Sequence, residues 1–132
     1  MPAADSNVLV RLLTNDSLAQ TDAVRRLLDR LERERGLLYI PLTAVLELEW
    51  VLRALYDFAK VQVLEALSEL LETRELDFEN EAVLEQALAL YRAHNIDFGE
   101  CLHLANALQA ARVPFLTFDK AASKLPGAAR LA

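Results

Sequence analysis

The chain has few of the residues that interrupt regular structure. Its 132 residues include three glycines and four prolines, so we expect helices joined by short connections. No apolar run reaches the roughly 18 residues of a membrane span, and the N-terminus lacks the basic and then apolar layout of a secretory signal. The single cysteine, Cys101, excludes an internal disulfide framework. We therefore expect a cytoplasmic protein with no membrane association.

Basic residues are also in deficit. The sequence has 14 Lys and Arg but 20 Asp and Glu, which gives a net charge of −6. A duplex DNA binder usually shows an excess of basic residues on one face. Here acids and bases alternate, as in RRLLDRLERER, which is typical of a solvated helix with internal ion pairs. Affinity for a nucleic acid would have to come from a metal or a local patch.

The chain alternates short apolar stretches with helical patterns. This alternation predicts one α/β domain over residues 1–132, with a parallel sheet. Ligands of such sheets gather beyond the carboxyl ends of the strands, where Asp5 and Asp119 are expected. We expect strands before Asp5, in LLYIP, at 75–77, in VPFLTF and at 130–132, and helices from Ser6 and over 18–34, 43–55, 58–72, 80–93 and 98–111, with Asn95 ending the helix at 80–93.

Five acids stand in settings where surface carboxylates are unusual: Asp5, Glu47, Asp97, Glu100 and Asp119. A buried carboxylate without a partner is costly. Most of these acids have no basic neighbour in the sequence. A hard divalent cation such as Mg²⁺ or Mn²⁺ is the natural partner, because both prefer oxygen ligands.

Helix capping is an alternative explanation for several of these acids. Asp5 can cap the helix SNVLVRLL, and Asp119 can cap KAASKL. Asp97 and Glu100 have the spacing of a capping box, which is compatible with a carboxylate that also faces a cleft. These alternatives remain open on spacing alone.

Glu47 has an internal control in Glu49. Glu49 lies four residues before Arg53, which predicts an exposed ion pair. Glu47 has apolar neighbours, so we expect it to project from the apolar side of the helix and favour a functional role. We expect Trp50 and His103 in the core, and Cys101 as a small buried residue.

Four blocks of the sequence, in order and spacing, resemble a PIN-domain protein. They are DSNVLVRLLTND, PLTAVLELEWVL, DFGECLHLANAL and FLTFDK, and together they cover essentially the whole chain. The resemblance is closest to VapC-type toxins of bacterial toxin–antitoxin pairs. It implies an α/β/α three-layer sandwich around a short parallel sheet.

The resemblance also implies the site and its partners. The four acids of the family fall on Asp5, Glu47, Glu100 and Asp119, of which Asp5, Glu100 and Asp119 would bind Mg²⁺ or Mn²⁺. The implied activity is endoribonuclease cleavage of RNA, with a small antitoxin protein as inhibitor and a homodimer as the assembly.

Four further residues correspond to accompanying positions of the family. Ser6 and Asn7 follow the first acid, and Thr117 stands two residues before the last. Asp97 matches an acid often found three residues before the third, which makes it a supporting metal ligand in this resemblance. Asn7 and Thr117 would hold the carboxylates in orientation.

One departure from the family concerns the third acid, commonly Asp, which is Glu100 here. Mg²⁺ demands near-ideal octahedral geometry, so a longer side chain could shift activity or make Asp97 the principal ligand. This motivates the alternative of a non-catalytic PIN-like binding module. A phosphatase or receiver domain is disfavoured, because the acid pairs that such domains need near the first strand are missing from MPAADSN.

Overall fold

A computed structural model describes residues 1–14 and 16–132, in two compact units, Met1–Glu79 and Asn80–Ala132. The chain is a helix-rich α/β protein with short parallel strands, which confirms the expected fold class. None of the described helices is long and apolar enough to cross a membrane. The expectation of a single domain stays a prediction.

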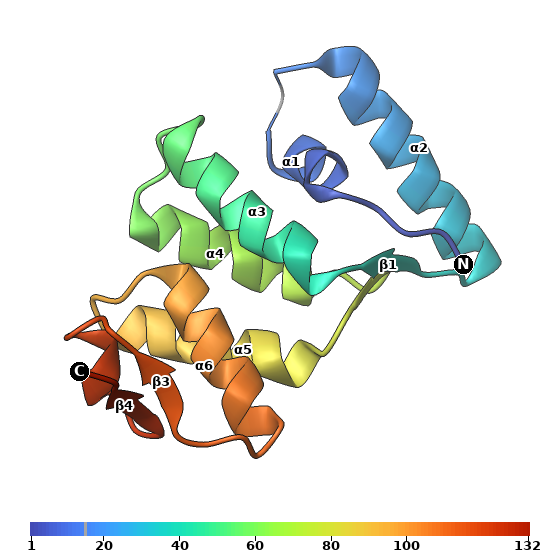
Figure 1. The fold of residues 1–132 in the computed structure, drawn as a ribbon. Helices are drawn as coiled ribbons and strands as arrows, with labels where there is room; N and C mark the ends of the chain where they lie inside the picture. Colours follow the sequence, from blue (N-terminus) through green and yellow to red (C-terminus); the bar gives the residue numbers. More distant parts are fainter. Residues whose placement is uncertain (15) are drawn as a thin grey trace. The chain divides into compact units, whose positions relative to one another are not determined.

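The first unit contains four helices and one pair of parallel strands (Figure 1). Helix α1 contacts α2 and α3, α3 contacts α4, and α4 contacts strand β2. Its core is aliphatic, with fully buried side chains such as Leu9, Ile40 and Leu48. The elements are α1 (Ser6–Leu13), α2 (Leu18–Glu34), β1 (Leu38–Ile40), α3 (Leu42–Ala54), α4 (Lys60–Leu71) and β2 (Leu76–Phe78).

Strands β1 and β2 run parallel, with Leu38 opposite Leu76 and Ile40 opposite Phe78. The strand expected before Asp5 is a single parallel bridge between Ala3 and Tyr39. Two backbone hydrogen bonds hold it, from the Tyr39 N–H to Pro2 and from the Ala4 N–H to Tyr39. Asp5 therefore directly follows a strand-like segment that lies beside β1.

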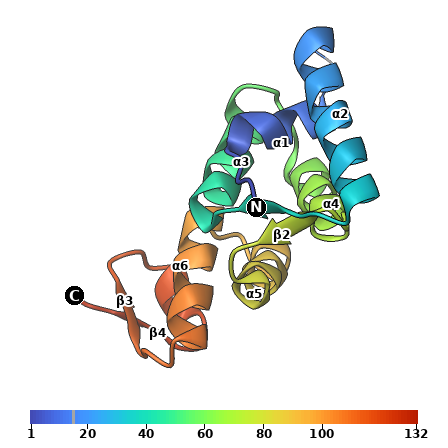
Figure 2. The ribbon, with the colours of Figure 1, turned by 90° about the vertical axis from the view of Figure 1, so that its right-hand side faces the viewer.

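The second unit consists of α5 (Glu81–Ala93), α6 (Phe98–Gln109), β3 (Phe115–Thr117), the short 3₁₀ helix η1 (Ala122–Lys124) and β4 (Ala128–Arg130). Helices α5 and α6 pack side by side, and β3 lies beside α6 (Figure 2). Strands β3 and β4 pair in parallel. Gly127 precedes β4 with φ of +89°, and a Cβ there would lie 2.6 Å from Leu108 Cδ2, so this turn requires glycine.

Several details differ from the sequence-based expectations. Helix α5 ends at Ala93, with His94 as its extended C-cap, so Asn95 does not end the helix. The last strand is Ala128–Arg130 rather than 130–132. His103 is exposed rather than packed in the core, whereas Cys101 is buried as expected.

Candidate functional site

Two of the predicted acids line one cavity in the first unit. The cavity has a volume of about 270 Å³ and lies where β1 and the bridge strand end. This is the edge of a parallel arrangement at which ligands usually bind. The lining residues are Ala3, Ala4, Asp5, Ser6, Pro41, Thr43, Ala44 and Glu47.

Asp5 both caps α1 and lines the cavity. Its Oδ1 accepts a hydrogen bond of 3.2 Å from the Val8 N–H, as a helix N-cap does. The capping alternative is therefore confirmed, but the side chain is also exposed at the cavity. A carboxylate has about four lone-pair sites, so the cap leaves acceptor capacity for a ligand.

Glu47 is held by a hydroxyl that lies far away in the sequence. The Ser6 side chain is 1% exposed, and its Oγ donates a hydrogen bond to Glu47 Oε1. Because Ser6 is the first residue of α1 and Glu47 lies in α3, this bond connects two packed helices. Thr43, one helical turn before Glu47, lines the same cavity.

The exposures of Glu47 and Glu49 are the reverse of those expected. Glu47 is exposed, whereas Glu49 is 2% exposed. The ion pair between Glu49 and Arg53 is present, with both carboxylate oxygens accepting from the guanidinium. Two charge-assisted bonds offset the cost of burying this carboxylate, so burial alone does not mark a site residue.

Glu79 was not singled out from the sequence, yet it helps to place Glu47. Its Oε1 accepts a 2.9 Å hydrogen bond from the N–H of Leu42, the first residue of α3. Its own N–H donates to Ile40 O at 2.8 Å. Glu79 thereby ties the start of α3 to the carboxyl ends of β1 and β2. Its position directly after the strand LDF is the sequence feature that could have identified it.

In the second unit, Asp97 and Glu100 stand at the start of α6. Asp97 is the N-cap residue, and its Oδ2 accepts a 3.1 Å hydrogen bond from the Gly99 N–H. This confirms the Asp97 half of the expected capping box. Glu100 lies in the first turn and is half-buried. The Gly99 N–H thus sets the direction of the Asp97 carboxylate.

Asp119 lies in the turn before η1, whose N-cap residue is Ala121. Its Oδ1 accepts a 2.9 Å hydrogen bond from the Ala122 N–H at the start of η1. Its own N–H donates to Thr117 Oγ1 at 3.0 Å, so the hydroxyl predicted to accompany this acid does contact its backbone. Lys120 and Lys124, beside it in sequence, are exposed.

The predicted residues thus form separate groups within the two units. Asp5 and Glu47 share a cavity with Ser6, whereas Asn7 is exposed on α1 and does not line it. Asp97 and Glu100 share a helix start, and Thr117 contacts Asp119. Within the described parts of the chain, no three His, Cys, Asp or Glu side chains gather closely enough to hold a metal ion.

The Asp5–Glu47 cavity nevertheless fits a hard divalent cation. Of the described residues that line it, two are carboxylates and none is basic. Mg²⁺ usually keeps several waters and binds through one or two carboxylates together with substrate phosphates. The donor set therefore suits such an ion.

Comparison with protein families decides what kind of domain this is. The sequence model of the PIN domain matches residues 3–128. The chain belongs to the PIN-domain family. PIN domains are generally nucleases and are typically dependent on divalent metals.

No curated protein matches the chain significantly. Among solved structures, a chain of a toxin–antitoxin complex from Klebsiella pneumoniae is similar at 19% sequence identity and a TM-score of 0.37. That match covers 100% of this chain and 97% of the other.

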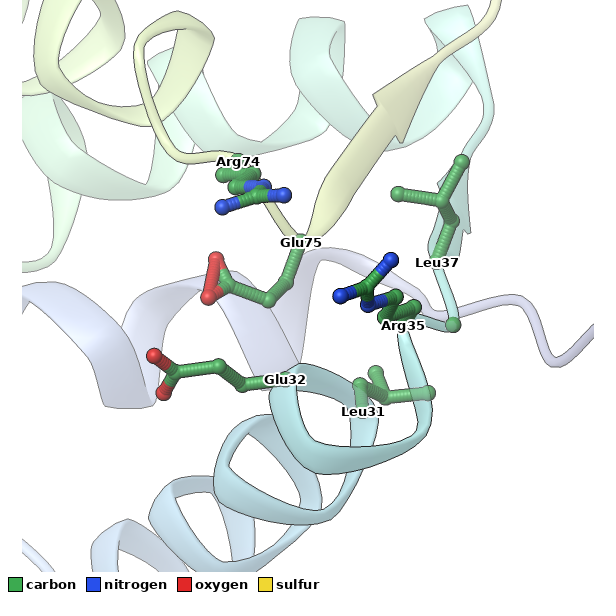
Figure 3. Close-up of a pocket in the computed structure, with 7 residues that line it drawn as sticks. Leu31, Glu32, Arg35, Leu37, Arg74 and Glu75 are labelled. Carbon is green, nitrogen blue, oxygen red and sulfur yellow. The ribbon is translucent and has the colours of Figure 1, made fainter.

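A larger cavity of this PIN-domain protein, about 430 Å³, lies in the first unit away from the predicted acids (Figure 3). It is found at the amino ends of the strands, since Leu37 precedes β1 and Glu75 precedes β2. Its charged side chains are two acids and two arginines, namely Glu32, Glu75, Arg35 and Arg74. It is charge-balanced, so it lacks the feature that favours a cation at the smaller cavity.

Asp16 is an acid that accepts hydrogen bonds from several side chains. Tyr56 donates a 2.6 Å hydrogen bond to its Oδ2, and Thr14 and Arg11 donate to its Oδ1. The Tyr56 hydrogen bond, followed by those of Thr14 and the charge of Arg11, lowers the pKa of Asp16 from its ordinary value of 3.8. This carboxylate needs no metal to be stable as an anion.

Proposed function

We propose that this PIN-domain protein is a metal-dependent endoribonuclease of the VapC type, the toxin of a toxin–antitoxin pair. The observation that carries the proposal is the shared cavity of Asp5 and Glu47, with two carboxylates and no basic residue among its described lining residues. In this proposal, which rests on the resemblance of the sequence blocks, Asp5, Glu47, Glu100 and Asp119 are the catalytic carboxylates. The substrate is RNA, hydrolysed at phosphodiester bonds.

The proposed cofactor is Mg²⁺ or Mn²⁺. Asp5, Glu100 and Asp119 would hold it, with Asp97 as a further ligand. Such an ion, when bound, supplies a polarised phosphoryl oxygen and an acidified water. Its positive charge would offset the repulsion between carboxylates brought together around it.

The remaining roles belong to the side chains themselves. The Ser6 hydroxyl donates to Glu47 and fixes the direction of its carboxylate. Glu47 is therefore preorganised to accept a proton from an attacking water. The Thr117 hydroxyl holds the backbone N–H of Asp119 and thus the turn that carries this acid. Asn7 would orient the first acid from the same helix turn. Such outer contacts commonly change activity 10- to 100-fold.

The partners follow from the resemblance of the sequence blocks to VapC toxins. We propose an inhibitory antitoxin protein, a homodimeric assembly and a cytoplasmic location. A short reading frame directly upstream of the gene would support the antitoxin part.

Cleavage of RNA by purified protein tests the proposal. We expect cleavage with Mn²⁺ or Mg²⁺, loss of cleavage on chelation, and loss on the substitution Asp5→Asn. Glu32→Gln is the matched control, because Glu32 is an exposed acid in the charge-balanced cavity. If Asp5→Asn cleaves RNA as fast as the wild type, the activity is a contaminant and the proposal is wrong.

The same assay separates the alternative, a non-catalytic PIN-like binding module. The observation that favours it is Glu100 at a position where the family commonly has Asp. This alternative predicts RNA binding by wild-type protein without cleavage at any Mn²⁺ concentration. Restoration of cleavage by Glu100→Asp would identify the longer side chain as the cause.

A further inference from the structure

The face of α3 that carries Glu47 continues beyond the cavity. This face consists of exposed residues that recur at helical spacing, namely Thr43, Glu47, Trp50 and Ala54. The opposite face packs into the core through its buried residues, Ala44, Val45, Leu48, Glu49 and Leu52. The exposed stripe therefore leads from the acid-lined cavity directly to an aromatic ring.

Trp50 is the unusual member of this stripe. Its side chain is 54% exposed, contrary to the core position expected from the sequence. Three residues of an α-helix rise about 4.5 Å, so the indole ring begins about one turn from Glu47. Exposed tryptophan is characteristic of binding surfaces, because it offers a large rigid area at little entropic cost.

We propose that Trp50 is a stacking platform for a base of the RNA, next to the phosphate that is cleaved. The inference rests on the proposed nuclease function. A protein with net charge −6 gains little from general attraction to phosphates. Aromatic stacking supplies affinity without positive charge, about 1–3 kcal/mol per base, and it accepts every base.

RNA is favoured over a protein segment as the occupant because the stripe is continuous with the cavity. Glu47 lines that cavity, and Trp50 is the next exposed residue of the same helix face. A base held on the indole ring would place its own backbone close to the carboxylates. Trp50 is a positioning residue in this role, since it contacts a base and not the reacting atoms.

The chain contains a single tryptophan, so its fluorescence reports on this site alone. The first measurement uses Glu47→Gln protein, which keeps the proposed metal ligands but should not cleave, with Mn²⁺ and a short single-stranded RNA. We expect the emission of free protein to be that of a solvated indole, open to acrylamide, and to be quenched as RNA binds. Shielded emission in the free protein, RNA binding with unchanged emission, or no RNA binding at all would each overturn the inference.

The second measurement uses substitutions in the active protein. Trp50→Ala should raise KM by about 5- to 150-fold, the equivalent of one stacked base, with a smaller change in kcat. Trp50→Phe should recover a large part of the affinity, because a smaller ring still stacks. Leu55→Ala is the matched control, since Leu55 is 66% exposed but stands off the stripe.

The outcomes separate this inference from the proposed function. Cleavage by wild type together with normal KM in Trp50→Ala overturns the stacking role and leaves the nuclease proposal intact. Loss of antitoxin binding in Trp50→Ala with unchanged KM would instead assign the ring to a protein partner. If Trp50→Ala does not fold, Trp50→Phe and the fluorescence titration still decide the question.

Discussion

The two ends of the β1–β2 strand pair differ in the charges that surround their acids. At the carboxyl end, Asp5 and Glu47 line a cavity in which no described lining residue is basic. At the amino end, Glu32 and Glu75 share a cavity with two arginines (Figure 3). The first arrangement leaves negative charge for a cation to neutralise. In the second arrangement, the two arginines already balance the charge of the two acids.

The same distinction separates two acids on one helix. Glu49 is buried and satisfied by Arg53, whereas Glu47 is exposed and held only by a neutral hydroxyl among the contacts described above. Among the described residues, the lack of a cationic partner thus distinguishes Glu47 from Glu49. Four predictions test this comparison.

The largest effect is expected on cleavage. Glu47→Gln should lower kcat/KM for RNA by at least about 100-fold, because it removes a proposed catalytic carboxylate while a hydrogen-bond acceptor for Ser6 remains. Glu75→Gln, in the charge-balanced cavity, should cleave at the wild-type rate. Equal losses in the two variants would show that the carboxyl-end cavity has no special role.

Metal binding should stabilise the protein through the carboxyl-end acids. At Mn²⁺ 100-fold above its Kd, the free energy of unfolding should rise by about 2.7 kcal/mol, as measured by denaturant titration. Asp5→Asn should lose most of this gain, and Glu32→Gln should keep it. Stabilisation that survives Asp5→Asn would place the ion elsewhere.

Glu49→Gln should lower the stability of the fold without changing the rate of cleavage. Loss of a charged partner from a buried pair is costly, but the Arg53 side chain is 37% exposed, so we expect a loss of about 1–2 kcal/mol. Cleavage per folded molecule should be unchanged. Glu47→Gln serves as the converse control, with stability close to wild type. A stable but inactive Glu49→Gln would reverse the assignment of the two acids.

The smallest effect concerns Asp16, the acid with several partners. Its lowered pKa means that its contribution to stability is present above about pH 3.8 and is lost as the pH falls through the folded value. Tyr56→Phe removes the largest cause of the shift. The stability difference between wild type and Tyr56→Phe, from urea titrations at several pH values, should therefore shrink below pH 4. A constant difference would mean that Tyr56 acts by packing alone.

Much of the local structure was predictable from the sequence. The span of α2, the strand LYI and the caps Asp5 and Asp97 agree with expectation, because capping and periodicity are local properties. The end of α5 at Ala93 agrees with expectation, but the capping role of Asn95 does not, since the chain is already extended at His94. The hydrogen bond between Ser6 and Glu47 joins residues 41 positions apart, which no local pattern reveals.

The sequence by itself determined the residue types of the site, the family to which the chain belongs and the approximate order of helices and strands. Tertiary structure decided which side of α3 faces the core, and hence that Glu49 is buried while Glu47 and Trp50 are exposed. The physical reason lies in α3 itself. It is apolar around most of its circumference, so its own pattern does not select one buried face. Packing against α1 and α4 makes that choice.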